Sequence, residues 1–193
     1  MRVGIGVRDH SGWAVAVALG VVQGAPLVLE RRRLLLCDPS LPRQAYHAGE
    51  HAGLEEARGI VTAVEESART NSRRELESLV RSLRGAGHDV AGIAVAGRPG
   101  ETLPPLEAIL RSHSLLHAAE GQLYREALAE AAESWLPVRR FVQKELFARA
   151  ASALGTTPDA LRATLAALGK PLGPPWTADQ KEAAAAAWIV LGE

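Results

Sequence analysis

The 193 residues of this chain suffice for one domain with a sizeable core, and hydrophobic residues make up 47% of them. Basic and acidic side chains number 22 each, so the chain lacks the overall basic surplus of dedicated nucleic-acid binders. Cys37 is the only cysteine, which excludes an intramolecular disulfide, and the longest apolar stretches are too short to span a bilayer. We therefore expect one cytoplasmic domain, 1–193, with no membrane partner.

Three β-rich runs open the chain, and turn-forming residues separate them. They predict an antiparallel meander with strands at Arg2–Val7, Trp13–Val22 and Leu27–Cys37. The run Arg31-Arg32-Arg33 falls on the third strand, where alternation sends Arg32 to the face opposite its two neighbours. Without interleaved aromatic residues, this run is more typical of a charged sheet edge than of a nucleic-acid site.

From residue 54 onward, helical spacing alternates with short buried strands. Helices are predicted over Leu54–Leu83, with Asn71-Ser72 as a point of breaking or bending, and over Leu106–Trp135, with a break at Ser112–Ser114. Further strands are predicted at Val90–Ala96 and Pro137–Val142, and three final helices at Lys144–Leu154, Pro158–Leu168 and Thr177–Leu191.

This order of elements resembles the ribonuclease-H-like superfamily, and within it the RuvC-type resolvase branch. Val3-Gly4-Ile5-Gly6 followed by Gly12-Trp13-Ala14-Val15 is similar to that branch's first hairpin, and Asp179-Gln180-Lys181-Glu182-Ala183-Ala184 is similar to its last helix. The resemblance implies an α/β fold with a mixed five-stranded sheet, made of a three-strand antiparallel meander plus two parallel strands and flanked by helices.

The resemblance also implies phosphodiester cleavage by two divalent metals held on clustered carboxylates. Gly6 stands where the first strand should carry an aspartate, and the fourth strand, Ile93–Gly97, has no acid. Asp179 and Glu182 match the pattern. Asp9 and Glu101 lie a few residues beyond the missing positions and could substitute for them. The implied metal ligands are therefore Asp9, Asp179 and Glu182, with Mg²⁺ or Mn²⁺ as the cofactor.

A second group of ionisable residues interrupts the apolar face of the helix predicted from Leu106. His113 and His117 share that face with Glu120 at its edge. Buried ionisable groups need partners. The group therefore predicts a metal site, an acid–base pair, a structural hydrogen-bond network, or a surface cluster that follows a helix break at Ser112–Ser114.

His47-Ala48-Gly49-Glu50-His51 matches the H-x-x-E-H pattern of one class of zinc proteases. Gly49 and Gly53 weaken the helix that this pattern needs, so a solvated loop or helix start is the favoured interpretation. A joint alternative is that both histidine pairs, one around His47 and one around His113, converge on one transition metal.

Three hypotheses for function follow. In the first, the chain is a ribonuclease-H-like binding or regulatory module that lacks the acid triad. In the second, it is a metal-dependent phosphodiester hydrolase with a rearranged site, whose candidate catalytic residues are Asp9, Glu101, His113, His117, Glu120, Asp179 and Glu182. In the third, it is a structural partner that forms a homodimer through a sheet edge or its long helix.

Overall fold

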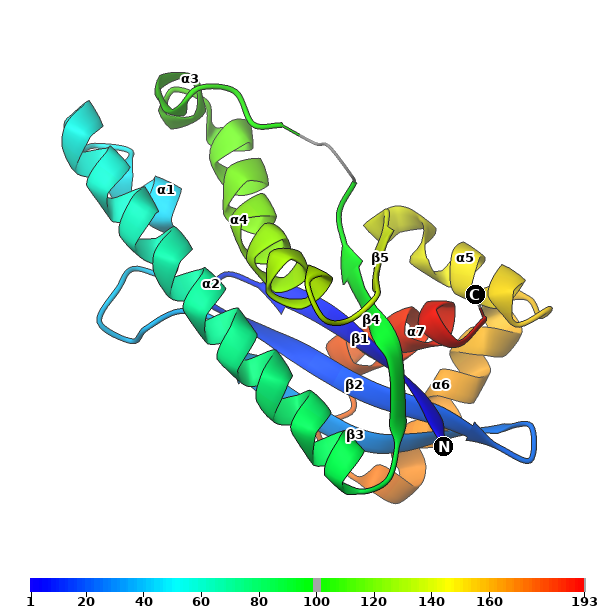
Figure 1. Cartoon of the computed structure of the whole chain (residues 1–193). Coiled ribbons are helices and arrows are strands. Elements are labelled where there is room, and N and C mark those ends of the chain that lie inside the picture. Colours follow the sequence, from blue (N-terminus) through cyan, green and yellow to red (C-terminus); the bar gives the residue numbers. More distant parts are fainter. Residues whose placement is uncertain (99–101, 193) are drawn as a thin grey trace.

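A computed structural model describes residues 1–98 and 102–192, and its centre is a five-stranded sheet with the strand order β3-β2-β1-β4-β5 (Figure 1). The strands are β1 (Arg2–His10), β2 (Trp13–Val22), β3 (Ala25–Leu35), β4 (Asp89–Ala96) and β5 (Val138–Phe141). β1, β2 and β3 pair antiparallel, whereas β4 pairs parallel with both β1 and β5. The predicted meander plus two parallel strands is confirmed.

Seven α-helices and one 3₁₀ turn surround the sheet within the described ranges. They are α1 (Ala45–Gly49), α2 (Leu54–Gly85), α3 (Leu106–Leu110), α4 (His113–Glu133), the 3₁₀ turn Gln143–Glu145, α5 (Leu146–Ala153), α6 (Pro158–Leu172) and α7 (Ala178–Gly192). The predicted break near Ser112 is confirmed, since α3 and α4 are separate helices. The short helix α1 falls in a stretch that the sequence left without a predicted element.

The break or bend expected at Asn71-Ser72 was wrong as a break, because α2 continues through both residues. The Asn71 amide donates to the carbonyl oxygen of Ser67 at 2.9 Å, one turn earlier, so its side chain bonds along the helix. Ser72 is fully buried. α2 is therefore one rod of 32 residues that runs along one face of the sheet (Figure 1).

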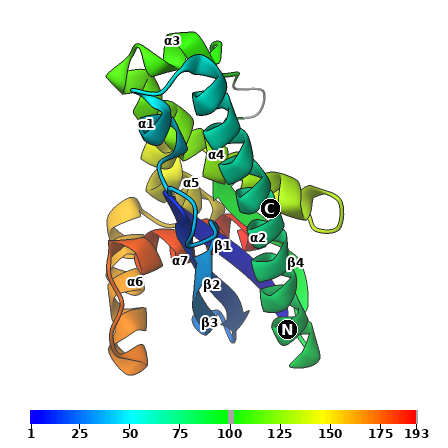
Figure 2. The same ribbon diagram turned by 90° about the vertical axis from the view of Figure 1, so that its left-hand side faces the viewer.

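The sheet divides the core into two layers (Figure 2). On β1, Val3, Ile5 and Val7 face the layer that contains α2 and α4. Gly4 and Gly6 alternate with them and face α7 on the other side, where α5 and α6 complete the second layer. This alternation along β1 decides which side chains at the end of that strand can meet.

Glycine lets α7 rest directly on the backbone of β1. A Cβ atom built on Gly6 would lie 2.8 Å from Ala186 Cβ, and closer still to the carbonyl oxygen of Ala183 and the amide nitrogen of Ala187. Real Cβ atoms essentially never show contacts under 3.0 Å. The helix residues that meet Gly6 are the alanines Ala183, Ala186 and Ala187, and all three are fully buried. The two smallest residue types thus set the distance between strand and helix.

Arginine side chains connect β3 to the elements on both sides of the sheet. The Arg31 guanidinium donates to four consecutive carbonyl oxygens at the end of α6 and directly after it, those of Leu172, Gly173, Pro174 and Pro175, at 2.6–3.1 Å. Arg32 donates to Ser78 of α2 at 3.0 Å, on the opposite face. β3 is an edge strand. The predicted alternation of the arginine run is therefore confirmed.

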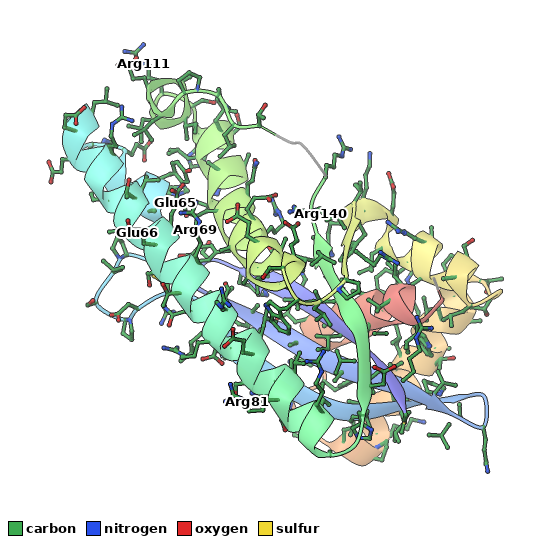
Figure 3. The ribbon with its side chains drawn as sticks, viewed as in Figure 1. Glu65, Glu66, Arg69, Arg81, Arg111 and Arg140 are labelled. Carbon is green, nitrogen blue, oxygen red and sulfur yellow. The ribbon has the colours of Figure 1, made fainter. Side chains whose placement is uncertain are left out.

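Ion pairs join α2, α4 and β5, and Figure 3 shows Glu65, Arg69 and Arg140 around α4. Arg69 Nε lies 3.2 Å from Glu130 Oε2, and Arg140 donates to both carboxylate oxygens of Glu126 at 2.7 and 2.9 Å. The bond to Glu126 raises the pKa of Arg140, whereas burial raises the pKa of the Glu65 carboxyl. None of the helices in the described residues is long and apolar enough to cross a membrane.

Candidate functional site

Asp9, the acid nearest the end of β1, projects toward the α4 side of the sheet. Its side chain is almost completely buried, with 6% of the residue exposed. Arg125 of α4 lies 3.6 Å from it, measured from Nη1 to Oδ2. The other carboxylate oxygen, Oδ1, is buried and makes no hydrogen bond to any of the described residues. Burying a carboxylate costs free energy when one of its oxygens has no hydrogen-bond partner. The ion pair with Arg125 offsets part of that cost.

Asp179 and Glu182, the two acids predicted on the last helix, lie in the first turns of α7 and face β1 from the other side. His10 Nε2 lies 3.1 Å from Asp179 Oδ1. Arg8 Nε lies 2.7 Å from Glu182 Oε2, and the Gln143 amide donates to the same oxygen at 2.8 Å. The two acids therefore have different partners on neighbouring elements: His10 for Asp179, and Arg8 and Gln143 for Glu182.

Arg8 stands between the two acidic groups. While its Nε contacts Glu182, its Nη1 lies 3.7 Å from Asp9 Oδ1. A metal shared by Asp9 and Glu182 would need the space that this guanidinium fills. Across residues 1–98 and 102–192, the group of three or more ligand side chains that comes close enough to hold a metal includes none of these acids. Glu101, the remaining predicted carboxylate, lies outside the described residues. A shared carboxylate site stays a prediction.

The two positions at which the family resemblance expects acids are closely packed. Gly6 faces the backbone of α7 with no room for a side chain. The end of β4 consists of Ala94, Val95 and Ala96, all buried in the core layers. At the two positions where the resemblance expects carboxylates, this chain therefore has a glycine on β1 and small apolar residues on β4.

The second predicted group, on α4, is split between the surface and the interior. His113 and His117 are exposed on the first two turns, whereas Glu120 is 3% exposed. The predicted single stripe from Leu106 does not form, because the chain breaks between α3 and α4. The two imidazoles remain neighbours, with 3.1 Å between their Nε2 atoms and perpendicular ring planes.

His47 of α1 completes this group from a distant part of the chain. Its ring centroid lies 4.8 Å from that of His117 and 6.0 Å from that of His113. One ligand nitrogen from each of the three histidines lies within 4.8 Å of the others. Three imidazoles from two helices therefore converge at the surface, above buried Glu120.

Glu120 connects the histidine group to the backbone of α1. Its Oε1 accepts hydrogen bonds from the backbone amides of Tyr46, at 2.7 Å, and His47, at 3.2 Å, and lies 3.3 Å from His47 Nδ1. Its Oε2 is buried and has no hydrogen-bond partner within residues 1–98 and 102–192. The adjacent phenol is also affected, since burial, together with Glu65 and Glu120, raises the pKa of Tyr46 to about 12.

His51 does not join the group. α1 ends at Gly49, and His51 lies exposed in the following turn. The helix that the H-x-x-E-H pattern needs is therefore too short to bring His47 and His51 onto one face. Of the four histidines in the joint alternative, His47 meets His113 and His117, whereas His51 does not; a metal bound by them stays a prediction.

Sequence reasoning missed the cations that hold the acids, Arg8 and Arg125. Alternation along β1 was a usable signal for Arg8, since it places that residue on the same face as Gly6 and hence toward α7. Arg125 lies on α4, 116 residues from Asp9, and no local spacing connects the two. Such pairs depend on how helices dock on the sheet.

Comparisons with known proteins find similarity in solved structures alone. No family model matches the sequence, and no curated protein matches it. A structure of "T. thermophilus RuvC in complex with Holliday junction substrate" has a TM-score of 0.52 and 16% identity, over 98% of this chain and 92% of that one. A second structure, of Thermus thermophilus RuvC, has a TM-score of 0.51 and 15% identity, over 97% and 92%. The chain therefore has the ribonuclease-H-like fold of RuvC.

Proposed function

We propose that this chain is a ribonuclease-H-like binding or regulatory module, in which helix packing and ion pairs replace the acid triad that would hold two divalent metals. The observation that carries this proposal is the contact between β1 and α7 at Gly6. An aspartate there needs a Cβ atom, and that atom would overlap Ala183, Ala186 and Ala187. The first metal ligand of the fold's hydrolytic site is thus missing, and its place is filled.

The charges of the remaining acids support the same conclusion. Divalent-metal sites use carboxylates whose negative charge is available to the ion. Here Asp9 lies beside Arg125, Asp179 beside His10 and Glu182 beside Arg8. A metal that entered would have to displace Arg8 from both Asp9 and Glu182. Each acid already has a partner in the folded chain, which favours a structural role for it.

A concave surface next to these acids is a candidate binding site for such a module. A cavity of about 340 Å³ lies between the β2–β3 face and the start of α7, lined in part by Trp13, Arg33 and Asp179. The Trp13 ring stacks on His10 at a centroid distance of 4.1 Å, and Arg33 Cζ lies 3.9 Å from the same ring's centroid. Aromatic, cationic and acidic groups together suit a small polar ligand.

The similar RuvC structure was solved with a Holliday junction. Nucleic acid is therefore a ligand to test here, although a chain of zero net charge does not attract phosphates over long distances as basic nucleic-acid binders do.

A second candidate function is hydrolysis by a rearranged site with Mg²⁺ or Mn²⁺. The buried Oδ1 of Asp9 favours it, since an unbonded carboxylate oxygen is a potential metal ligand or proton acceptor.

The experiment that tests the proposal compares cleavage of branched, duplex and single-stranded DNA in Mg²⁺ and in Mn²⁺, alongside a calorimetric titration with Mn²⁺. The variants are Glu182→Gln and, as a matched control, Glu55→Gln, whose carboxylate on α2 is 88% exposed. We expect no metal-dependent cleavage by any of the three proteins. Cleavage that Glu182→Gln abolishes and Glu55→Gln retains, with both variants folded, would establish the hydrolase instead.

A further inference from the structure

We propose that His47, His113 and His117 form a binding site for one transition-metal ion of the zinc class, with Glu120 as the residue that orients His47. This site lies on α1 and α4 and uses none of the acids at the end of β1 or the start of α7. The inference is independent of the proposed function, because it concerns other residues and another class of metal.

The geometry of the three imidazoles fits a single ion. Zinc–nitrogen bonds are about 2.0–2.1 Å long, so two nitrogens on one tetrahedral ion lie roughly 3.3 Å apart. The Nε2 atoms of His113 and His117 are already 3.1 Å apart. The ligand nitrogens of all three residues lie within 4.8 Å of one another. His113 and His117 are exposed, so their rings can change rotamer to bring the nitrogens closer to that spacing.

The position of Glu120 provides a second, independent indication of a ligand. In metal sites, a histidine ligand usually donates its other ring N–H to a carboxylate, which fixes the tautomer and the ring orientation. Glu120 Oε1 lies 3.3 Å from His47 Nδ1, so a proton on Nδ1 leaves Nε2 with its lone pair available to the metal. Glu120 is 3% exposed and its Oε2 has no hydrogen bond. A nearby cation would offset the cost of burying that charge.

The ligand types select the metal. Imidazole nitrogen suits Zn²⁺, Cu²⁺, Ni²⁺ and Co²⁺, whereas Mg²⁺ and Mn²⁺ favour oxygen. Three histidines leave the fourth position of a tetrahedral ion for water or a ligand. His47 also lines a cavity of about 630 Å³ with Ser11, Arg43 and Gln44. A group bound to the metal could therefore extend toward the turn between β1 and β2.

The test is calorimetric titration of chelator-treated full-length protein with ZnCl₂, with Co²⁺ absorption spectra as a report on coordination. We expect one metal per chain. His47→Ala, His113→Ala and His117→Ala should each weaken binding at least about tenfold, and Glu120→Gln about 10- to 100-fold. His51→Ala is the matched control, since this exposed histidine is close in sequence to His47 but outside the cluster. It should bind as the wild type does.

Thermal denaturation with and without Zn²⁺ provides a second measurement, because an ion that binds the folded state alone raises the melting temperature. The increase should disappear in the triple variant His47→Ala/His113→Ala/His117→Ala. The proposal is overturned if the wild type binds less than one equivalent of Zn²⁺ and Co²⁺, or if the triple variant binds as tightly as the wild type. Loss of binding in His51→Ala would also overturn it. The cleavage assays measure nuclease activity in Mg²⁺ and Mn²⁺, whereas these titrations measure the binding of Zn²⁺ and Co²⁺, so the two proposals can fail separately.

Discussion

Replacing Gly6 by alanine adds one methyl group at the contact between β1 and α7. The added carbon would meet a carbonyl oxygen, an amide nitrogen and a Cβ atom of α7, each at less than 3.0 Å. None of these atoms is at the end of a flexible side chain, so no rotamer change relieves the overlap. The helix or the strand must move, and both are in the buried core.

The expected cost follows from that geometry. α7 has to retreat until all three contacts open beyond 3.0 Å, which loosens the packing of the fully buried Ala183, Ala186 and Ala187 against β1. Overpacked cores lose about 1–3 kcal/mol, and a backbone contact belongs at the upper end of that range. We therefore expect Gly6→Ala to lower the free energy of unfolding by about 3 kcal/mol. For a domain of this size, that corresponds to a melting temperature lower by roughly 6–12 °C.

Urea denaturation followed by circular dichroism measures this change, and Gly59→Ala is the matched control. Gly59 lies in α2, with nothing within 4 Å of a Cβ built on it. The same substitution should therefore stabilise the protein by about 0.5–1 kcal/mol through helix propensity. Neutral surface changes typically alter the free energy of unfolding by no more than about 0.5 kcal/mol. If the free energies of unfolding of Gly6→Ala and the wild type differ by less than that, α7 does not rest on β1 as described.

Two other substitutions test the edges of the fold. Arg31→Met should lower the free energy of unfolding by about 2–3 kcal/mol, because four carbonyl oxygens at and after the end of α6 lose a charged donor. The control in the same urea titration is Arg33→Met, which removes a contact with Trp13. Equal effects of the two substitutions would contradict this role of Arg31. Burial raises the pKa of the Glu65 carboxyl above its ordinary value of 4.5, so the folded state binds the carboxyl proton more tightly than the unfolded state does. The free energy of unfolding should therefore fall as the pH rises from about 4.5 through the pKa of Glu65 in the folded state. Glu65→Gln removes this dependence and should therefore gain stability over the wild type more at about pH 7 than at about pH 4, while a constant difference between the two proteins would refute the assignment.

Local pattern predicted most of the fold because most elements carry their own signals. Trp13–Val22 was predicted with the bounds that β2 has, since a continuous apolar run lies between two turns. The helix break near Ser112 was visible in the same way. α1 was missed because five residues are too few for a periodic pattern, and Gly49 argues against a helix.

The candidate sites depended on tertiary contacts, which local pattern does not contain. The spacing of His113, His117 and Glu120 predicted one shared helix face; the two histidines are neighbours as expected, whereas Glu120 is buried. The contribution of His47 could be stated only as one alternative, because 66 residues separate it from His113. The pairing of Glu182 with Arg8 required knowledge of how α7 docks on the sheet.

The close seat of α7 on β1 limits the evolutionary routes open to this chain. An aspartate in place of Gly6 would destabilise the folded protein, since even its Cβ atom would collide with the backbone of α7. A variant with a carboxylate there would first need substitutions that move α7 away from β1, and these would themselves lower stability. The contact at Gly6 therefore makes a substitution in β1 depend on prior changes in α7.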